Sequence, residues 1–236
     1  MVPAREVTAK DVEENAETLR NVRLWDFAPL LRSYRQLQEI RSYYEFYGID
    51  VDRYELGDER RQLMLSPREL DLRQLQNPTW VNLHLEFTHG YGVVASPVNE
   101  VTPTGQPIFF IKDLPPESSV PIQVERPQIY YGESPSSYVL VKTGVKEFDY
   151  PMGDANVRTT YEGNGGVPIG SLWRRLLFAT RFGDSRILFT DVILPESRIM
   201  FYRTINERVR RVAPFLRYDG DPYLVIAEGR LFWVQD

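Results

Sequence analysis

Prolines and glycines interrupt the chain repeatedly between residues 91 and 162, and this punctuation constrains the fold more than any other feature of the sequence. Only short runs of strand-forming residues remain between the interruptions, and turn-forming residues bound each run. The expected strands cover residues 91–95, 108–112, 122–125, 138–142 and 157–161. The middle of the chain, about 91–162, is therefore predicted to be a mostly antiparallel sheet region with long, structured loops.

A helical pattern precedes this region. Asp26 suits a helix N-cap and Pro29 suits a first turn. From Leu30 to Tyr44, apolar residues recur at steps of three and four, which predicts a helix of about four turns. Gly48 is the expected stop.

Other local patterns predict further helices. Residues 66–69 have the sequence of a capping box, Asn77-Pro78 opens a helix that Gly90 ends, and residues 172–182 form a helix that Gly183 stops. A long helix is expected from Pro195 to residue 212, because apolar residues form a stripe along it.

Two hairpins complete the predicted elements. One spans residues 54–65 with Gly57-Asp58 as its turn, and the other spans residues 224–234 with Glu228-Gly229 as its turn. Both faces of the C-terminal hairpin are apolar, so it is expected to be covered on both sides. Helices that bracket a strand-rich middle favour an α+β fold over regular βαβ alternation.

The expected domain organisation is simple. Residues 1–20 are polar and are predicted to be an N-terminal tail, and residues 21–236 are predicted to be a single domain. The glycine-rich stretch 163–170 is a candidate boundary for a subdivision. No apolar run approaches the ~20 residues needed to span a bilayer, and the start does not have the pattern of a signal peptide. The chain alone is therefore expected to be a soluble piece.

Composition excludes several classes of function. The chain has no cysteine, which excludes disulfides, thiolate zinc sites and cysteine nucleophiles. Its net charge of −5 argues against nucleic-acid binding, because such binding needs a basic face.

His89 is the first candidate for chemistry. It lies between Thr88 and Gly90, in a turn that leads into an apolar strand, where a general base or a metal ligand would be accessible. The other histidine, His84, is five residues away, and this spacing does not fit the paired histidines of a zinc helix. A simple hydrogen bond in the turn is the alternative, and neither a metal nor a cofactor is assigned.

Carboxylates are the second candidates. Asp149, Asp154 and Glu162 lie in predicted loops near tyrosines, which is a common setting for sugar binding. A glycan hydrolase would need two of them about 5 to 9.5 Å apart across a cleft.

Two loops resemble ligand-binding motifs without completing them. Within residues 162–171, Gly165 and Gly170-Ser171 have the spacing of a phosphate loop but no lysine, so a linker into a helix is favoured. Asp219-Gly220-Asp221 resembles the start of a calcium loop but lacks the later oxygen ligands, so a plain turn is favoured.

Arginines make the late predicted helix strongly basic. This segment is a candidate for binding anions or a membrane surface. The alternative is a solvated face that pairs with Glu196 and Glu207. The arginines are Arg203, Arg208, Arg210 and Arg211.

Many runs of the chain resemble one protein family. Thr-His-Gly-Tyr-Gly-Val-Val-Ala-Ser-Pro-Val-Asn at 88–99 and Arg-Pro-Gln-Ile-Tyr-Tyr-Gly-Glu at 126–133 are among the most specific. In this order along the chain, they resemble the uncharacterised protein family 0182 of bacterial multi-pass membrane proteins. The other runs are residues 19–26, 34–41, 51–54, 147–151, 161–168, 174–179, 213–216 and 229–234.

The resemblance implies a location but no chemistry. The resemblance implies an architecture of several transmembrane helices followed by a large extracytoplasmic domain. The chain is expected to be a fragment of that domain. The implied partners are the membrane-embedded part of the same full-length protein, an envelope component or an anionic lipid. The prediction is a non-catalytic extracytoplasmic binding or scaffold module at the cell membrane, with an envelope glycan hydrolase as the alternative.

Overall fold

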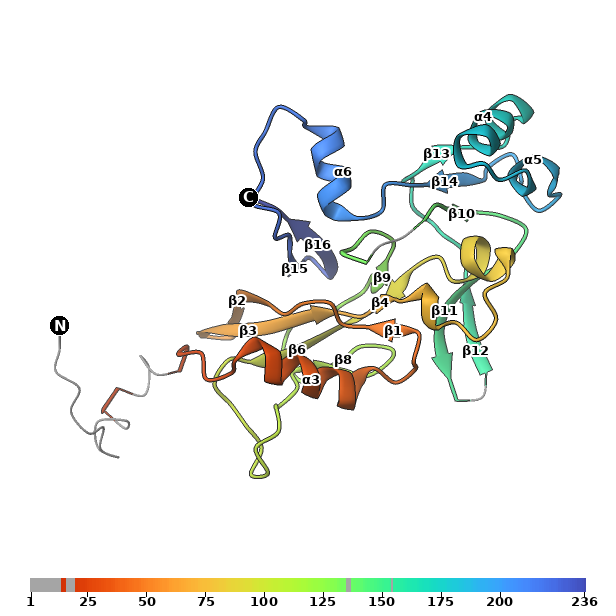
Figure 1. The fold of residues 1–236 in the computed structure, drawn as a ribbon. Helices are drawn as coiled ribbons and strands as arrows, with labels where there is room; N and C mark the ends of the chain where they lie inside the picture. The colour runs from red at the N-terminus through yellow and green to blue at the C-terminus, as the bar shows by residue number, and fades with distance from the viewer. Residues whose placement is uncertain (1–13, 16–19, 135–136, 154) are drawn as a thin grey trace.

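The computed structural model describes residues 14–15, 20–134, 137–153 and 155–236 (Figure 1). It confirms the predicted α+β class, because short helices surround several small antiparallel sheets. Most of the predicted N-terminal tail, residues 1–20, lies outside the described residues. Among the helices of the described ranges, none combines the length and the apolar character that crossing a bilayer requires.

The described helical segments are α3 (Phe27–Gln38), α4 (Leu172–Phe182), α5 (Arg186–Phe189), α6 (Ile205–Val212), the 3₁₀ turn η1 (Leu72–Gln74) and the π-helical turn η2 (Asn82–Glu86). The strands are β1 (Tyr44–Glu45), β2 (Asp50–Leu56), β3 (Glu59–Pro67), β4 (Glu69–Leu70), β5 (Gly90–Tyr91), β6 (Val93–Pro97), β7 (Ile111–Lys112), β8 (Glu117–Ser118), β9 (Gln128–Ile129), β10 (Val139–Val141), β11 (Glu147–Met152), β12 (Ala155–Thr159), β13 (Val167–Pro168), β14 (Arg198–Met200), β15 (Tyr223–Ala227) and β16 (Arg230–Val234).

The largest sheet has the order β2-β3-β6-β7-β8, and all of its neighbouring strands are antiparallel. The predicted hairpin around Gly57-Asp58 is confirmed, because β2 and β3 pair from Asp50 with Leu65 to Leu56 with Glu59. The sheet therefore uses two strands that precede the expected range of 91–162.

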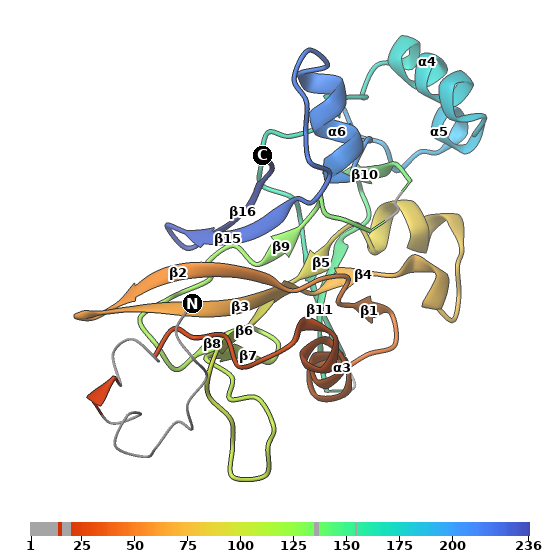
Figure 2. The ribbon, with the colours of Figure 1, turned by 60° about the vertical axis from the view of Figure 1, so that its left-hand side comes forward.

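Alternating side chains on the central strands bury both faces of this sheet. Leu63 and Leu65 of β3 pack with Leu224 and Ile226 of the C-terminal hairpin, whereas Met64 points the other way. There it packs with residues of α3, because successive side chains of a strand leave on opposite faces. Figures 1 and 2 show α3 below the sheet and the hairpin β15–β16 above it.

A second core lies in the upper right part of Figure 1. The three-stranded sheet β10-β14-β13 packs there with α4, α5 and η2 around Leu140, Ile169 and Ile199. Two pairs of short strands, β1–β4 and β5–β9, and the hairpin β11–β12 complete the described sheets.

Several predicted helices are wrong or too long. α3 begins at the expected cap, where the Asp26 side chain accepts from Ala28 N at 2.9 Å, but it ends at Gln38 rather than near Gly48. Residues 66–69 form no helix. Ser66 pairs with Val94 in the sheet, because tertiary strand pairing takes precedence over the local capping pattern.

The predicted long helix after Pro195 contains a strand. Residues 198–200 form β14, which pairs with β10 and β13, and the helix α6 begins only at Ile205. The C-terminal hairpin is confirmed, but it is covered on one face. Leu224 and Ile226 are buried, whereas Phe232 is 40% exposed.

Candidate functional site

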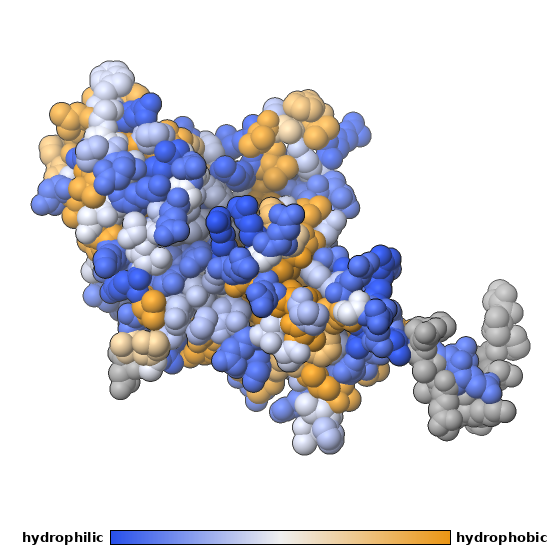
Figure 3. All heavy atoms as spheres, turned by 180° about the vertical axis from the view of Figure 1, so that it is seen from behind, coloured by the Kyte–Doolittle hydropathy of each residue, from blue (hydrophilic) through white to orange (hydrophobic). Residues whose placement is uncertain are grey.

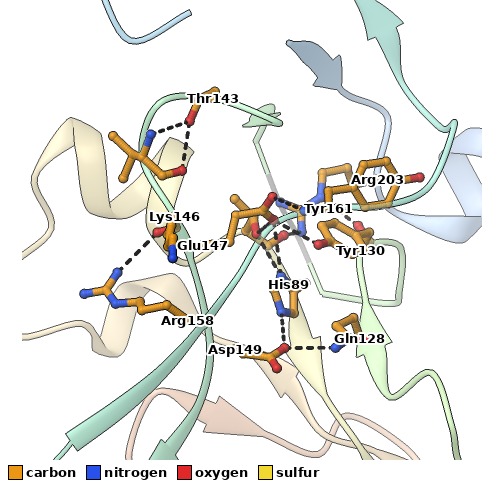
Figure 4. Close-up of polar contacts among 12 residues, drawn as sticks. His89, Gln128, Tyr130, Thr143, Lys146, Glu147, Asp149, Arg158, Tyr161 and Arg203 are labelled. Atoms are coloured by element: carbon orange, nitrogen blue, oxygen red, sulfur yellow. Dashed lines mark hydrogen bonds and ion pairs between the residues drawn. The ribbon is translucent and has the colours of Figure 1, made fainter. Parts of the chain in front are cut away.

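Segments that are distant in the sequence bring polar side chains into one buried cluster (Figure 4). Thr88 and His89 come directly before β5, Glu147 and Asp149 lie on β11, and Arg203 lies between β14 and α6. The exposed fraction is 0% for Thr88 and His89 and no more than 7% for the other three. Two of the predicted site residues, His89 and Asp149, are thus in contact.

One strand supplies both carboxylates of the cluster. Glu147 and Asp149 are two residues apart on β11, so their side chains leave the strand on the same side. The pairing of β11 with β12 shifts register between Phe148 and Tyr150, an irregularity that often re-aims a side chain. Figure 4 shows His89 between the two carboxylates.

The hydrogen bonds around His89 require a proton on both ring nitrogens. Thr88 Oγ1 donates its one hydrogen to Glu147 Oε2 at 2.5 Å, so it accepts from His89 Nδ1, which is 2.8 Å away. On the other side of the ring, His89 Nε2 lies 3.2 Å from the acceptor Asp149 Oδ1. Because both partners accept, the geometry favours the positively charged imidazolium.

The pKa values of the cluster agree with this charge state. Burial alone would lower the pKa of His89, but its contacts with Asp149 and Glu147 outweigh burial and raise it above the ordinary value. For Glu147, burial favours the neutral acid, yet contacts with His89, Thr88 and Tyr130 lower its pKa below the ordinary value. His89 and Glu147 therefore form a buried ion pair, bridged by Thr88.

Further protein groups hold the carboxylates in place. Tyr130 donates its hydroxyl to Glu147 Oε2 at 2.9 Å, and Tyr161 donates its backbone N–H to Glu147 Oε1 at 3.0 Å. Gln128 donates to Asp149 Oδ1 at 3.0 Å. These bonds compensate for removing the charges from water.

Arg203 connects the cluster to the neighbouring strands. Its Nε donates to the carbonyl of Tyr130 at 2.8 Å and its Nη2 donates to the carbonyl of Thr88 at 2.6 Å. Burial lowers the pKa of Arg203 to about 10, so the side chain remains charged at neutral pH. This arginine therefore fixes the chain on both sides of the β5–β9 pair.

The cluster has almost no free space beside it. A cavity of about 20 Å³ lies next to Arg203 and Tyr130 and is also lined by Glu69 and Gly132. A water molecule needs roughly 10–15 Å³, so this cavity has room for about one water. Neither Thr88 nor His89 lines this cavity.

The cluster contains the residue types of a catalytic relay, but a substrate could not reach its hydroxyl group. A hydroxyl, a histidine and a carboxylate follow one another in the order Thr88, His89, Asp149. A nucleophile must reach its substrate, and the hydroxyl of Thr88 is fully buried and directed at Glu147. The arrangement supports a structural role for the buried charges.

The carboxylates proposed for a glycan hydrolase differ in exposure where the structure describes them. Asp149 is buried in the cluster, whereas Glu162 is exposed, and Asp154 lies outside the described residues. The metal-dependent alternative at His89 lacks converging ligands, because Glu147 and Asp149 approach opposite ring nitrogens. Among the described residues, no group of three or more ligand side chains is arranged to hold a metal ion.

The four predicted anion-binding arginines separate into two groups. Arg203 is buried, and Arg208 lies over the ring of Tyr131 at 4.3 Å from its centre. Arg210 and Arg211 are exposed and line an open cavity of about 670 Å³ beside α6. Arg208 is half-buried, so Arg210 and Arg211 are the exposed members of the set.

The two incomplete ligand motifs are used by the fold itself. Arg198 donates to the carbonyls of Gly165 at 2.6 Å and Gly166 at 2.8 Å, so the glycine-rich loop presents acceptors rather than a phosphate cradle. Asp219 accepts from the backbone N–H of Asp221 at 3.1 Å, which is the geometry of a turn.

Sequence reasoning missed Glu147, Gln128 and Tyr130. The alternation of Glu147 and Asp149 around Phe148 could have indicated two acids on one face of a strand. No local signal connects them to Gln128 or Tyr130, because the contacts are made between separate segments.

The fold is α+β, and within it His89 lies in a cluster of buried, paired charges. The chain belongs to the Uncharacterised protein family (UPF0182), whose model matches residues 1–236. The resemblance seen in the sequence is thereby confirmed.

Bacterial relatives support this assignment. The UPF0182 protein of Desulforamulus reducens is 52% identical over 235 residues, which cover 98% of this chain and 25% of the relative. The UPF0182 protein of Pelotomaculum thermopropionicum is 51% identical and that of Trichodesmium erythraeum is 48% identical, with 26% of each relative covered. The chain thus spans about a quarter of the length of these curated relatives. No solved structure matches the chain.

Proposed function

We propose that this chain is a non-catalytic binding module in the extracytoplasmic part of a bacterial integral membrane protein. Its partner is the remainder of the same longer protein, which packs against the outer face of α4. The observation that carries this proposal is that α4 is apolar on two faces, only one of which is buried by the described residues.

The buried face of α4 packs onto the second core. Phe178, Ala179 and Phe182 contact this core, and they lie on one side of the helix. At 3.6 residues per turn, Leu172, Trp173, Leu176 and Leu177 fall on the other side. Their exposed fractions are 72%, 68%, 41% and 53%, in that order.

An exposed apolar face of this kind is unusual for a helix at a surface. Surface helices normally have one apolar stripe and a polar opposite face. Large contiguous apolar patches on soluble domains usually mark interaction sites. The α4 face therefore has the character of an interface.

The length of the relatives supports the choice of partner. About three quarters of each relative lies outside the matching region, so a covering segment can come from the same polypeptide. The closed cluster around His89 favours a non-catalytic module, because Thr88 and His89 are fully buried.

Photo-crosslinking in the full-length protein tests the proposal. Benzoylphenylalanine in place of Trp173 is expected to crosslink to peptides outside the region that corresponds to this chain. The same group in place of Met152, which is 60% exposed on β11, is the matched control and should give far fewer such crosslinks. Leu176→Asp should remove the crosslinks from position 173, because it places a charge in the interface.

Two results would contradict the proposal. One is the absence of any crosslink from benzoylphenylalanine at position 173 in the assembled protein. The other is a sugar or another small substrate bound against His89 or Asp149 in a soaked crystal, which would favour the hydrolase.

A further inference from the structure

A second exposed apolar site lies at the end of α6, separate from the α4 face. We define the α6 tip as residues 210–217, which have the sequence Arg-Arg-Val-Ala-Pro-Phe-Leu-Arg. Val212 is 75% exposed, Phe215 is 82% exposed and Leu216 is 54% exposed. Phe215 is thus more exposed than any residue of the α4 face.

The α6 tip protrudes from the molecule. Figures 1 and 2 show α6 rising to the upper end, and the chain returning from its top toward the C-terminus. Figure 3, seen from behind, shows apolar side chains on two upper protrusions with a recess between them. The α6 tip and α4 lie on different protrusions.

Backbone contacts order the α6 tip, so its apolar side chains are held outward. Ala213 N donates to Val209 O at 3.0 Å, and Leu216 N donates to Ala213 O at 3.1 Å. The hydroxyl of Tyr218 donates to the same Ala213 carbonyl at 3.1 Å. Phe215 and Leu216 therefore lie in a closed turn at the top of the helix.

The charge of the α6 tip is opposite to that of the whole chain. The tip contains Arg210, Arg211 and Arg217 and no acidic residue, whereas the chain has a net charge of −5. Of the acids near the tip, Glu207 pairs with Arg211 at 3.2 Å, and Asp219 accepts from Asp221 N. Arg211 also lies over the ring of Tyr202, 3.8 Å from its centre.

We propose that the α6 tip docks on the surface of an anionic lipid bilayer. Phe215 and Leu216 enter the boundary between headgroups and acyl chains, and the three arginines contact lipid phosphates. Exposed aromatic and aliphatic side chains flanked by basic ones are the pattern of membrane-surface elements. Arginine fits both parts of such a boundary, because its stem packs on apolar groups while its head stays with the phosphates.

A bilayer fits this protrusion better than a protein partner does. A stable protein interface buries roughly 800 Å² on each partner and needs a broad complementary surface. The exposed apolar side chains of the α6 tip are confined to the turn at the end of one helix, which a soft, anionic surface accommodates without a matching pocket. This inference does not depend on the α4 interface.

Cosedimentation of the chain with vesicles tests the proposal. The chain should bind phosphatidylcholine vesicles that contain phosphatidylglycerol, and should bind pure phosphatidylcholine vesicles much more weakly. Binding should fall at high salt, because exposed charges are screened. Each Arg→Gln change at positions 210, 211 and 217 should lower the partition coefficient about fivefold, and the triple variant on the order of a hundredfold.

The apolar contribution is tested with a matched pair of variants. Phe215→Ser should lower vesicle binding roughly tenfold or more. The variant has no phenyl ring to transfer from water into the bilayer when the tip binds. Phe189→Ser changes a phenylalanine of equal character, 80% exposed on α5, and should leave binding unchanged. Circular dichroism of each variant checks that the fold is retained.

Three outcomes would overturn the inference. They are no binding to anionic vesicles at low salt, binding that survives the triple arginine change, and equal losses from Phe189→Ser and Phe215→Ser. Each would leave the α4 interface intact, since its partner is a protein.

Discussion

The chain's two histidines lie five residues apart, yet their surroundings shift their pKa values in opposite directions. His84 is stacked on Tyr138 with ring centres 4.1 Å apart, and its Nδ1 lies 2.7 Å from the Tyr138 carbonyl. Burial lowers the pKa of His84, and the charges of Arg186 and Arg203 add to this effect. His89 has carboxylates on both sides and its pKa is raised.

This contrast predicts two separate titrations. In an NMR pH titration of the imidazole signals, His84 should become protonated only below about pH 6.5, and His89 should remain protonated above it. The physical reason is that a buried charge is retained only where opposite charges compensate for lost hydration.

The His84→Gln variant assigns the two signals, because it removes one of them and leaves the buried ion pair intact. A neutral His89 at pH 6 would contradict the proposed charge state. The stabilisation from protonated His89 is complete below about pH 6.5 and is lost as the pH rises through its higher folded value.

At the scale of elements, close backbone contact between β4 and β5 depends on Gly90. A Cβ atom added at Gly90 would lie 2.4 Å from the carbonyl oxygen of Arg68 and 2.8 Å from Glu69 Cα. Both are backbone atoms, so neither can move aside as a flexible side chain would. The approach of these strands places Thr88 and His89 beside β11.

Gly90→Ala is therefore expected to lower the free energy of unfolding by about 2–3 kcal/mol. Urea denaturation measures the change. Gly48→Ala is the matched control, because its added Cβ would lie 3.5 Å from Glu133 Oε2, an ordinary contact. The control should differ from the unmodified chain by less than about 1 kcal/mol. Equal effects of the two changes would contradict the steric explanation.

The predictable elements are those whose boundaries are set locally. α4 begins where the Ser171 side chain accepts from Arg174 N, and it ends at Gly183 in the left-handed conformation with φ of 65°. Both hairpins were also predicted from alternation and from their turn residues. In these cases the sequence itself contains the stop signal.

Tertiary contacts decide the elements that the sequence did not predict. α3 ends early: the buried Arg68 donates to the carbonyl of Gln38 at 3.0 Å at its end, and Ile40 has a positive φ of 64°, which is not helical. Arg198 to Met200 join a sheet although their spacing continued a helical stripe. A periodic pattern records which residues are buried, but not which partner buries them.

The candidate site was predictable only in part for the same reason. His89 and Asp149 were each identified from their local sequence, but 60 residues separate them and no pattern indicated their contact. Glu147 and Arg203 complete the cluster through equally distant contacts. Arg203 was assigned to an exposed basic helix, whereas its position between β14 and α6 buries it.

At the scale of the whole molecule, the C-terminal hairpin closes onto the first hairpin. Leu224 N donates to Asp50 Oδ2 at 2.7 Å, and Ile226 N donates to the hydroxyl of Tyr54 at 2.9 Å. Burial raises the pKa of Asp50 to about 6, and the nearby Asp221 adds to the rise. Near neutral pH the Asp50 carboxylate in the contact with Leu224 is therefore charged, and its burial is unfavourable.

Asp50→Asn should stabilise the chain at pH 8 and have little effect at pH 4. An asparagine oxygen still accepts from Leu224 N but carries no charge. The folded pKa of Asp50 is raised, so its stabilisation is present below the unfolded value near 3.8 and is lost as the pH rises through about 6. A rise of about two pKa units corresponds to at most ~3 kcal/mol at pH 8.

Denaturant midpoints at the two pH values measure this effect. Glu117→Gln on β8 removes an exposed carboxylate instead and should change neither midpoint by a comparable amount. A destabilised Asp50→Asn variant at pH 8 would mean that the charged hydrogen bond to Leu224 outweighs the cost of burial.

The bond between Asp50 and Leu224 joins residues 174 positions apart, and it has a consequence for synthesis on the ribosome. At roughly 5–20 residues per second, the upper face of β2 and β3 is made about 10–35 seconds before the hairpin that covers it. During this interval Leu63 and Leu65 have no native cover from β15 and are available to holdase chaperones. Slowing translation between the two hairpins should prolong that vulnerable state and increase aggregation of the nascent chain.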